Sequence, residues 1–209
     1  MPKVEPFEKY TSKYEDWFER NKFAYESEIR AIKMLLPKGK SSLEIGVGSG
    51  RFAGPLGIEI GVEPSRKMGK IAQQRGIKVI YAVAENLPFA DSQFDSVLMV
   101  TTVCFLDDTK AAFREAYRVL KSGGGLVIGF IDKESPVGRL YRVHKNESVF
   151  YREATFYSVK EIVSYLKEIG FKDFSFIQTI FNNLSEIKEI EPIKEGYGEG
   201  SFVVVRAMK

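Results

Sequence analysis

The sequence has few of the residues that bind metals or form disulfides. Its 209 residues include one cysteine, Cys104, and one histidine, His144. A single cysteine cannot form an internal disulfide, and these two residues cannot supply a zinc or iron–sulfur cluster. We therefore expect no metal site.

Long apolar and long basic runs are also missing. The longest apolar stretch, around residues 97–106, is interrupted by Thr101 and Thr102 and is shorter than the roughly 20 residues that span a bilayer. The first residues lack the apolar core of a signal peptide. The net charge is only +3, and acids and bases are interspersed along the chain, unlike in proteins that track a nucleic-acid backbone. These absences predict a cytoplasmic protein with neither a membrane nor a nucleic-acid partner.

Strand and helix patterns alternate through the middle of the chain. Gly54, Pro55 and Gly57 lie between the first two predicted strands, so the helix there must be short. This alternation predicts βαβ units and a doubly wound α/β fold with a parallel sheet. The predicted strands of this series are residues 43–45, 58–63, 77–83, 95–100 and 125–131.

The segments on either side of this core have a different character. Residues 1–40 carry aromatic residues at helical spacing, and residues 132–157 combine aromatic residues with arginines in no clear period. A capping box at Ser158–Glu161 predicts the start of a helix, and two strands follow it. We therefore expect a single domain over 1–209, with an N-terminal helical cap (1–40), a cofactor-binding core (41–131), an insertion (132–157) and a C-terminal helix and strand pair (158–209).

A glycine-rich loop follows the first predicted strand. Gly46, Gly48 and Gly50 stand at alternate positions, and the next strand ends at Glu63. A strand, a glycine loop and a second strand that ends in an acid form a nucleoside-binding unit, because one carboxylate can accept hydrogen bonds from both ribose hydroxyls. A dinucleotide site requires a third small residue where this chain has Arg51. Arg51 therefore disfavours NAD(P).

Four stretches in order resemble the class I S-adenosylmethionine-dependent methyltransferases. Residues 44–50 (EIGVGSG) resemble the first motif of the family and residues 61–65 (GVEPS) resemble the second. Residues 84–89 (AENLPF) and 118–124 (RVLKSGG) resemble motifs of its small-molecule branch. The resemblance covers roughly residues 40–130. It implies a seven-stranded Rossmann-like sheet with an antiparallel last strand, with S-adenosylmethionine as methyl donor and S-adenosylhomocysteine as product.

The resemblance also implies roles for individual residues. Glu44 would hold the ammonium of the methionine moiety, through water, while Gly46 and Gly48 would let that moiety lie against the backbone. Glu63 would bind the ribose hydroxyls. Thr101 or Thr102 would line the methionine end of the cofactor.

The adenine end of the implied site departs from the family. Ala84 and Glu85 would meet the adenine edge, with Leu87 and Met68 packing on the ring, but Val83 stands where the family often has an aspartate. The predicted cofactor-binding set, in chain order, is Glu44, Gly46, Gly48, Gly50, Arg51, Glu63, Pro64, Met68, Ala84, Glu85, Leu87, Thr101 and Thr102.

Methyl transfer from a sulfonium is an in-line displacement that mainly requires alignment and exclusion of water. Aromatic rings near the sulfonium are favourable, so Tyr10 and Tyr14 are candidates for closing over the methyl group, with packing onto the core as their alternative role. His144 is a candidate base at neutral pH.

The acceptor pocket should come from residues 1–22 and 132–157, which lie outside the common core. Their aromatic residues suggest a small, partly apolar acceptor. Arg139, Arg142 and Arg152 suggest an acidic group on that acceptor, with surface charge as their alternative role.

The sequence therefore predicts S-adenosylmethionine-dependent methyl transfer to a small molecule. Two alternatives remain open at this stage, a catalytically silent S-adenosylmethionine-binding module and an NAD(P)-dependent oxidoreductase. The oxidoreductase is disfavoured by Arg51 and by the absence of a Tyr-x-x-x-Lys pair. The acceptor atom and the oligomeric state are not predicted.

Overall fold

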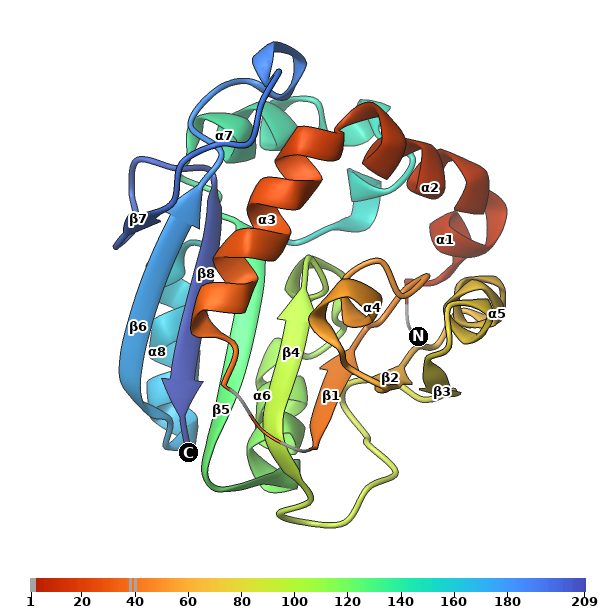
Figure 1. Cartoon of the computed structure of the whole chain (residues 1–209), viewed down its shortest axis with the longest axis vertical. Helices are drawn as coiled ribbons and strands as arrows, with labels where there is room; N and C mark the ends of the chain where they lie inside the picture. Colours follow the sequence, from red (N-terminus) through yellow and green to blue (C-terminus); the bar gives the residue numbers. More distant parts are fainter. Residues whose placement is uncertain (1–2, 38, 40) are drawn as a thin grey trace.

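The computed structural model describes residues 3–37, 39 and 41–209. In these residues eight strands form one sheet, in the order β3-β2-β1-β4-β5-β8-β6-β7 (Figure 1). The strands are β1 (Ser42–Ile45), β2 (Ile60–Val62), β3 (Lys78–Ile80), β4 (Phe94–Val100), β5 (Leu120–Ile131), β6 (Lys172–Thr179), β7 (Lys194–Glu195) and β8 (Phe202–Met208).

The strand directions confirm the predicted Rossmann-like fold. Strands β1 to β5 pair in parallel, and the last strand, β8, is antiparallel to β5 and β6. The sheet has one strand more than predicted, because the two residues of β7 pair with β6. The strand order reverses between β1 and β4, and ligands of doubly wound sheets bind beyond the carboxyl ends of the strands at such a point.

Helices cover both faces of the sheet. In Figure 1, α3 (Lys22–Leu35) crosses the near face, while α6 (Thr109–Val119) and α8 (Val159–Ile169) lie behind the sheet. Two further helices of the core are α4 (Ala53–Leu56), which is short as predicted, and α5 (Arg66–Gln74).

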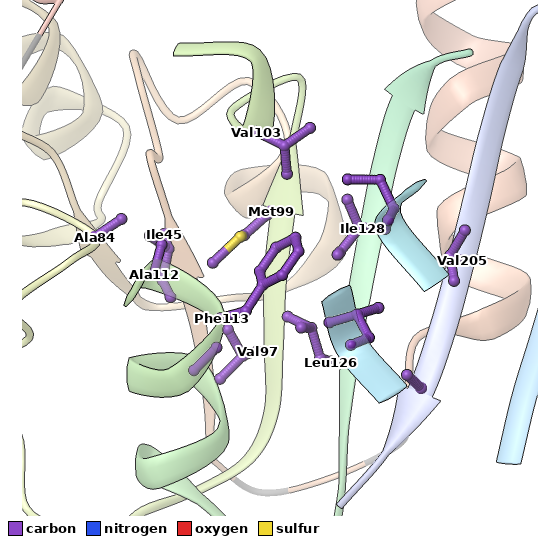
Figure 2. Close-up of a cluster of buried hydrophobic side chains, with 14 of the residues drawn as sticks. Ile45, Ala84, Val97, Met99, Val103, Ala112, Phe113, Leu126, Ile128 and Val205 are labelled. Atoms are coloured by element: carbon purple, nitrogen blue, oxygen red, sulfur yellow. The ribbon is translucent and has the colours of Figure 1, made fainter. Parts of the chain in front are cut away.

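Strand β4 is buried on both faces, as its apolar sequence predicts. Val97 and Met99 pack on one side with α6 and α8, and Leu98 and Val100 pack on the other side with α3. Figure 2 shows Phe113 of α6 against the first of these faces. This packing holds the carboxyl ends of β1 and β4 in a fixed position.

Two segments distant in sequence lie beyond the carboxyl ends of β1 and β4 (Figure 1). Residues 3–20 form α1 (Glu5–Lys9) and α2 (Thr11–Arg20), and residues 132–157 form α7 (Pro136–Val143) with the short turns η2 (Lys145–Glu147) and η3 (Tyr151–Glu153). We call these two segments together the cap; unlike the predicted N-terminal helical cap (1–40), it does not include α3. The remaining 3₁₀ turns are η1 (Val103–Phe105) and η4 (Leu184–Glu186). In the part of the chain that the structure describes, no helix is long and apolar enough to cross a membrane.

Candidate functional site

The glycine loop after β1 requires glycine for two different reasons. Gly46, Gly48 and Gly50 have φ values of +72°, +54° and +82°, in the left-handed region that is costly for other residues. A Cβ atom on Gly46 would also lie 2.4 Å from Cγ2 of Thr102. The loop is therefore both left-handed and closely packed.

The main chain of this loop is bonded to β2 and to the residues that follow it. The amides of Gly46 and Val47 donate to the carbonyl of Val62, at 2.8 and 3.0 Å. The amide of Gly48 donates to Oε2 of Glu63 at 2.8 Å, and the amide of Ser65 donates to Oε1 at 2.8 Å. Burial raises the pKa of Glu63 to about 7, although these two hydrogen bonds oppose the shift. The carboxyl group of Glu63 is thus held in place by the backbone.

Glu44 on β1 differs from Glu63 in its hydrogen bonding. Its side chain is 1% exposed, and within the described residues Oε2 has no hydrogen-bond partner. Burial raises the pKa of Glu44 well above its usual value, and the nearby charge of Glu63 adds to this effect. A buried carboxyl oxygen without a partner suits a ligand that donates a hydrogen bond from a cationic group.

A cavity of about 730 Å³ lies between the glycine loop and the cap. Its volume is in the range of small-molecule sites. The cofactor-binding residues that we predicted and that line it are Gly46, Gly48, Glu63, Pro64, Met68, Ala84, Glu85, Thr101 and Thr102. Of the three candidate catalytic residues, Tyr14 and His144 line it as well.

Four other predicted cofactor-binding residues are not part of the cavity wall. A Cβ atom on Gly50 would lie 3.3 Å from Ala72, so Gly50 allows α5 to pack closely. Leu87 is 3% exposed and belongs to the core behind the cavity. Glu44 and Arg51 are the other two predicted cofactor-binding residues that do not line the cavity. These positions indicate structural roles for Gly50 and Leu87.

Arg51 connects the glycine loop to the cap. Its Nη2 atom lies 2.7 Å from Oε2 of Glu15, and Nη2 of Arg75 lies 2.6 Å from the same oxygen. Burial alone would raise the pKa of Glu15, but hydrogen bonds from Arg75 and Arg51 outweigh it and lower the pKa to about 2. Glu15 therefore joins α2 to the loop and to the end of α5.

A second acid of the cap makes an equivalent connection at the start of α5. Oε1 of Glu8 accepts hydrogen bonds from the hydroxyl of Ser65 at 2.7 Å and from the amide of Lys67 at 3.1 Å. The ammonium of Lys67 donates to the carbonyl of Glu8 at 2.8 Å. The N-terminal part of the cap is thus bonded directly to the segment that carries Glu63.

Two of the sequence motifs turn out to be bonded to each other. Arg118, from the RVLKSGG stretch, donates to the carbonyls of Leu87 and Phe89 in the AENLPF stretch, at 3.0 and 2.7 Å. Glu115 accepts from the amide of Leu87 at 2.7 Å. Arg118 and Glu115 therefore hold the loop after β3 in position, and Ala84 and Glu85 of that loop reach the cavity.

The cap contributes an aromatic wall. Tyr14 packs edge-on against Phe7, Phe18 and Phe150, with ring centroids 5.1 to 6.3 Å apart. Burial raises the pKa of Tyr14 well above its usual value, and Glu44 and Glu63 contribute to the shift. Tyr10 contacts Phe150 but does not line the cavity. Tyr14 is therefore the better placed of the two tyrosines.

His144 and the three arginines of the insertion are largely exposed. His144 pairs with Glu147, with Nδ1 3.2 Å from Oε2. Arg139, Arg142 and Arg152 are exposed and do not line the cavity. Arg139 instead donates to the carbonyl of Glu134, at 2.7 and 2.8 Å. The suggestion of an acidic group on the acceptor thus loses its structural support.

Glu28 is a charged residue of the cavity wall that the sequence analysis did not predict. Glu28 of α3 is 4% exposed and lines the cavity. It stands four residues after Ala24 and four before Ile32, and both of these are buried. An acid inside the apolar stripe of a helix is the signal that could have revealed it.

Comparisons with known proteins agree with this geometry. A family model described as a methyltransferase domain matches residues 43–128. The uncharacterized protein MJ1123 of Methanocaldococcus jannaschii is 49% identical over 203 residues, which cover 97% of this chain and 98% of that protein.

Two solved structures extend the likeness to three dimensions. A SAM-dependent methyltransferase from Thermotoga maritima, named as a possible histamine N-methyltransferase, has 52% identity and a TM-score of 0.97, with 99% of each chain covered. Phosphoethanolamine N-methyltransferase 2 from Haemonchus contortus, in complex with S-adenosyl-L-methionine, shares the fold at a TM-score of 0.63 and 18% identity, over 88% of this chain and 52% of that one. The chain therefore belongs to the class I S-adenosylmethionine-dependent methyltransferase family, and S-adenosylmethionine is its cofactor.

Proposed function

We propose that this enzyme transfers a methyl group to a small molecule bound in the cavity between the glycine loop and the cap. The observation that carries the proposal is the cavity itself. It is about 730 Å³ in volume, and nine of the thirteen residues predicted to bind the cofactor share its wall with aromatic side chains of the cap. A site of this size accepts the cofactor together with a small acceptor.

The residues of the loop side fit the cofactor. The carboxyl group of Glu63, held by two backbone amides, would bind the ribose hydroxyls. Glu44 does not line the cavity, so its unpartnered Oε2 would reach the ammonium of the methionine moiety through water. Gly46 and Gly48 would admit that moiety against the main chain, since neither has a Cβ atom.

The bound cofactor supplies a methyl group on a cationic sulfur, a reactive group that needs alignment more than activation. The side chains of the cap would exclude water from it. Tyr14 would approach it from the cap side, with the edge-on contacts of Phe7 and Phe150 fixing the orientation of its ring.

Two measurements test the proposal. Thermal unfolding should shift upward with S-adenosylhomocysteine and not with NAD, since a ligand at ~100 times its dissociation constant adds roughly 2.7 kcal/mol. Transfer of a radiolabelled methyl group to a panel of small molecules should then be detected. Stabilisation by NAD alone would overturn the proposal, and binding of S-adenosylhomocysteine without any transfer would favour a catalytically silent module.

A further inference from the structure

Glu28 lies in the cavity wall beside the aromatic residues of the insertion. It is on α3, outside both the glycine loop and the cap, and its charge contributes to the raised pKa values of Tyr141 and Tyr151. These two tyrosines also line the cavity, and their rings stack with centroids 4.9 Å apart. A carboxyl group and a pair of stacked aromatic rings therefore share one region of the cavity.

The carboxyl group of Glu28 makes no hydrogen bond or ion pair with any residue that the structure describes. Its neighbour Ser27, by contrast, donates to the carbonyl of Phe23 at 2.7 Å and accepts from the amide of Glu191 at 2.8 Å. Burial raises the pKa of Glu28 to about 8. A buried acid without a partner is costly to a fold, and such residues cluster at functional sites, where a ligand supplies the partner.

The surroundings of Glu28 select the chemistry of that ligand. The cationic side chains of the cavity wall include Lys3, Lys13 and Arg20, but none of them lowers the pKa of Glu28. A ligand group that donates hydrogen bonds and carries positive charge would therefore stabilise the ionised form of Glu28, which burial disfavours. Aromatic ring faces attract the same kind of group.

We propose that the acceptor is an amine whose amino group is bound by the carboxylate of Glu28. This assignment rests on the methyl transfer proposed above. The bound ammonium first gives one proton to the carboxylate of Glu28, which leaves a lone pair on the nitrogen. This lone pair forms the new bond to the methyl carbon, the sulfur keeps the electron pair of the broken carbon–sulfur bond, and the product is the methylated ammonium. The stacked Tyr141 and Tyr151 enclose the amino group and the apolar body of the acceptor.

The test uses the full chain as wild type, as Glu28→Gln and as Glu26→Gln. Glu26 is on the same helix but is exposed, so its variant is the matched control. Binding of S-adenosylhomocysteine is measured first by calorimetry. The protein saturated with it is then titrated with 2-phenylethylamine, with histamine, and with the uncharged 2-phenylethanol and the acidic 3-phenylpropanoate.

We expect the wild type to bind at least one of the amines at least tenfold more tightly than 2-phenylethanol, and to methylate it with radiolabelled cofactor. Glu28→Gln should lose this preference while its affinity for S-adenosylhomocysteine stays unchanged, and Glu26→Gln should match the wild type. A purely structural role of Glu28 would not change the preference for amine over alcohol.

The amine assignment is overturned if the wild type binds S-adenosylhomocysteine but no amine, prefers the alcohol or the acid, or keeps its amine preference in Glu28→Gln. A wild type that fails to bind S-adenosylhomocysteine at all instead overturns the proposed function on which the assignment rests. Thermal unfolding of each variant confirms that it is folded.

Discussion

Two buried acids of the same cavity are held in different ways. Glu63, at the end of β2, is 7% exposed and accepts hydrogen bonds from two backbone amides. Glu28, on α3, is 4% exposed and has no partner among the described residues. The first carboxyl group is oriented before any ligand arrives, whereas the second depends on a ligand for its hydrogen bonds.

This difference matches two tasks in one site. A cofactor that is the same in every reaction benefits from a preorganised acid, because little ordering is needed when it binds. An acid without protein partners discriminates strongly among acceptors, since only a ligand with the correct donor removes the cost of its burial.

The first prediction concerns the pH dependence of stability. The pKa of Glu28 is raised from 4.5 to about 8, so the folded state keeps a proton that the unfolded state releases. Stability is therefore full below pH 4.5 and is lost as the pH rises toward 8, by roughly 5 kcal/mol at most. Glu63, with a pKa of about 7, acts in the same direction between pH 4.5 and 7, and so does Glu44, whose pKa burial raises well above its usual value.

Urea unfolding of the ligand-free protein at pH 5 and at pH 8 measures this loss. Glu28→Gln should remove much of it and should be more stable than the wild type at pH 8. An equal loss between the two pH values in both proteins would show that Glu28 is not the unpartnered acid described here.

The second prediction concerns the glycine loop. Gly46→Ala should destabilise the protein by about 3 kcal/mol, because a left-handed alanine costs about 1–2 kcal/mol and the overlap with Thr102 adds to this. Gly54→Ala is the matched control, since a Cβ atom there meets nothing within 4 Å and its φ is not positive. Thermal unfolding of the two variants measures the difference, and equal melting temperatures would contradict the described loop.

The third prediction concerns the preorganised acid. Glu63→Gln should weaken the binding of S-adenosylhomocysteine by about 10- to 100-fold, the range expected when hydrogen bonds to a charged group, worth about 1.5–3 kcal/mol, are lost. Glu59→Gln should leave binding unchanged, because Glu59 is exposed at the other end of the same segment. Calorimetry measures the affinity of both variants for S-adenosylhomocysteine. An unchanged affinity in Glu63→Gln would show that Glu63 does not bind the cofactor.

The fourth prediction separates the two tyrosines of the cap. Tyr14→Phe should weaken cofactor binding or slow turnover about three- to tenfold. This is the effect expected when one neutral hydrogen bond, worth about 0.5–1.5 kcal/mol, is lost. Tyr10→Phe should have no effect, because Tyr10 does not line the cavity. If both variants bind S-adenosylhomocysteine and turn over like the wild type, the proposed role of Tyr14 in the reaction is wrong.

The sequence identified the cofactor half of the molecule because local rules govern it. Parallel strands, the short α4 and the left-handed glycines each follow from a few neighbouring residues, since proline and glycine act through their own backbone angles. The position of Glu63 at the end of its strand follows from the same local pattern, and its proposed role at the ribose comes from the place of ligands in this fold. These features led to the fold class and to the methyl donor.

The roles of other motif residues were decided by distant contacts. The position of Arg51 in the glycine loop disfavoured a dinucleotide cofactor. The sequence did not show that the side chain of Arg51 forms an ion pair with Glu15 of the cap. Leu87, predicted to pack on the adenine ring, instead lies in the core and is held by Arg118 and Glu115. Spacing along the chain does not tell which side of a loop faces the ligand.

Local sequence patterns were thus sufficient to predict the sheet, the glycine loop and the methyl donor. The proposed acceptor side of the cavity depends on contacts that form only in the folded chain. Glu28, Tyr141 and Tyr151 come from segments more than 100 residues apart along the chain, and no local pattern links them. They meet because α3 packs across the sheet while the insertion covers its carboxyl end, and burial then turns an ordinary helical glutamate into an acid without a partner.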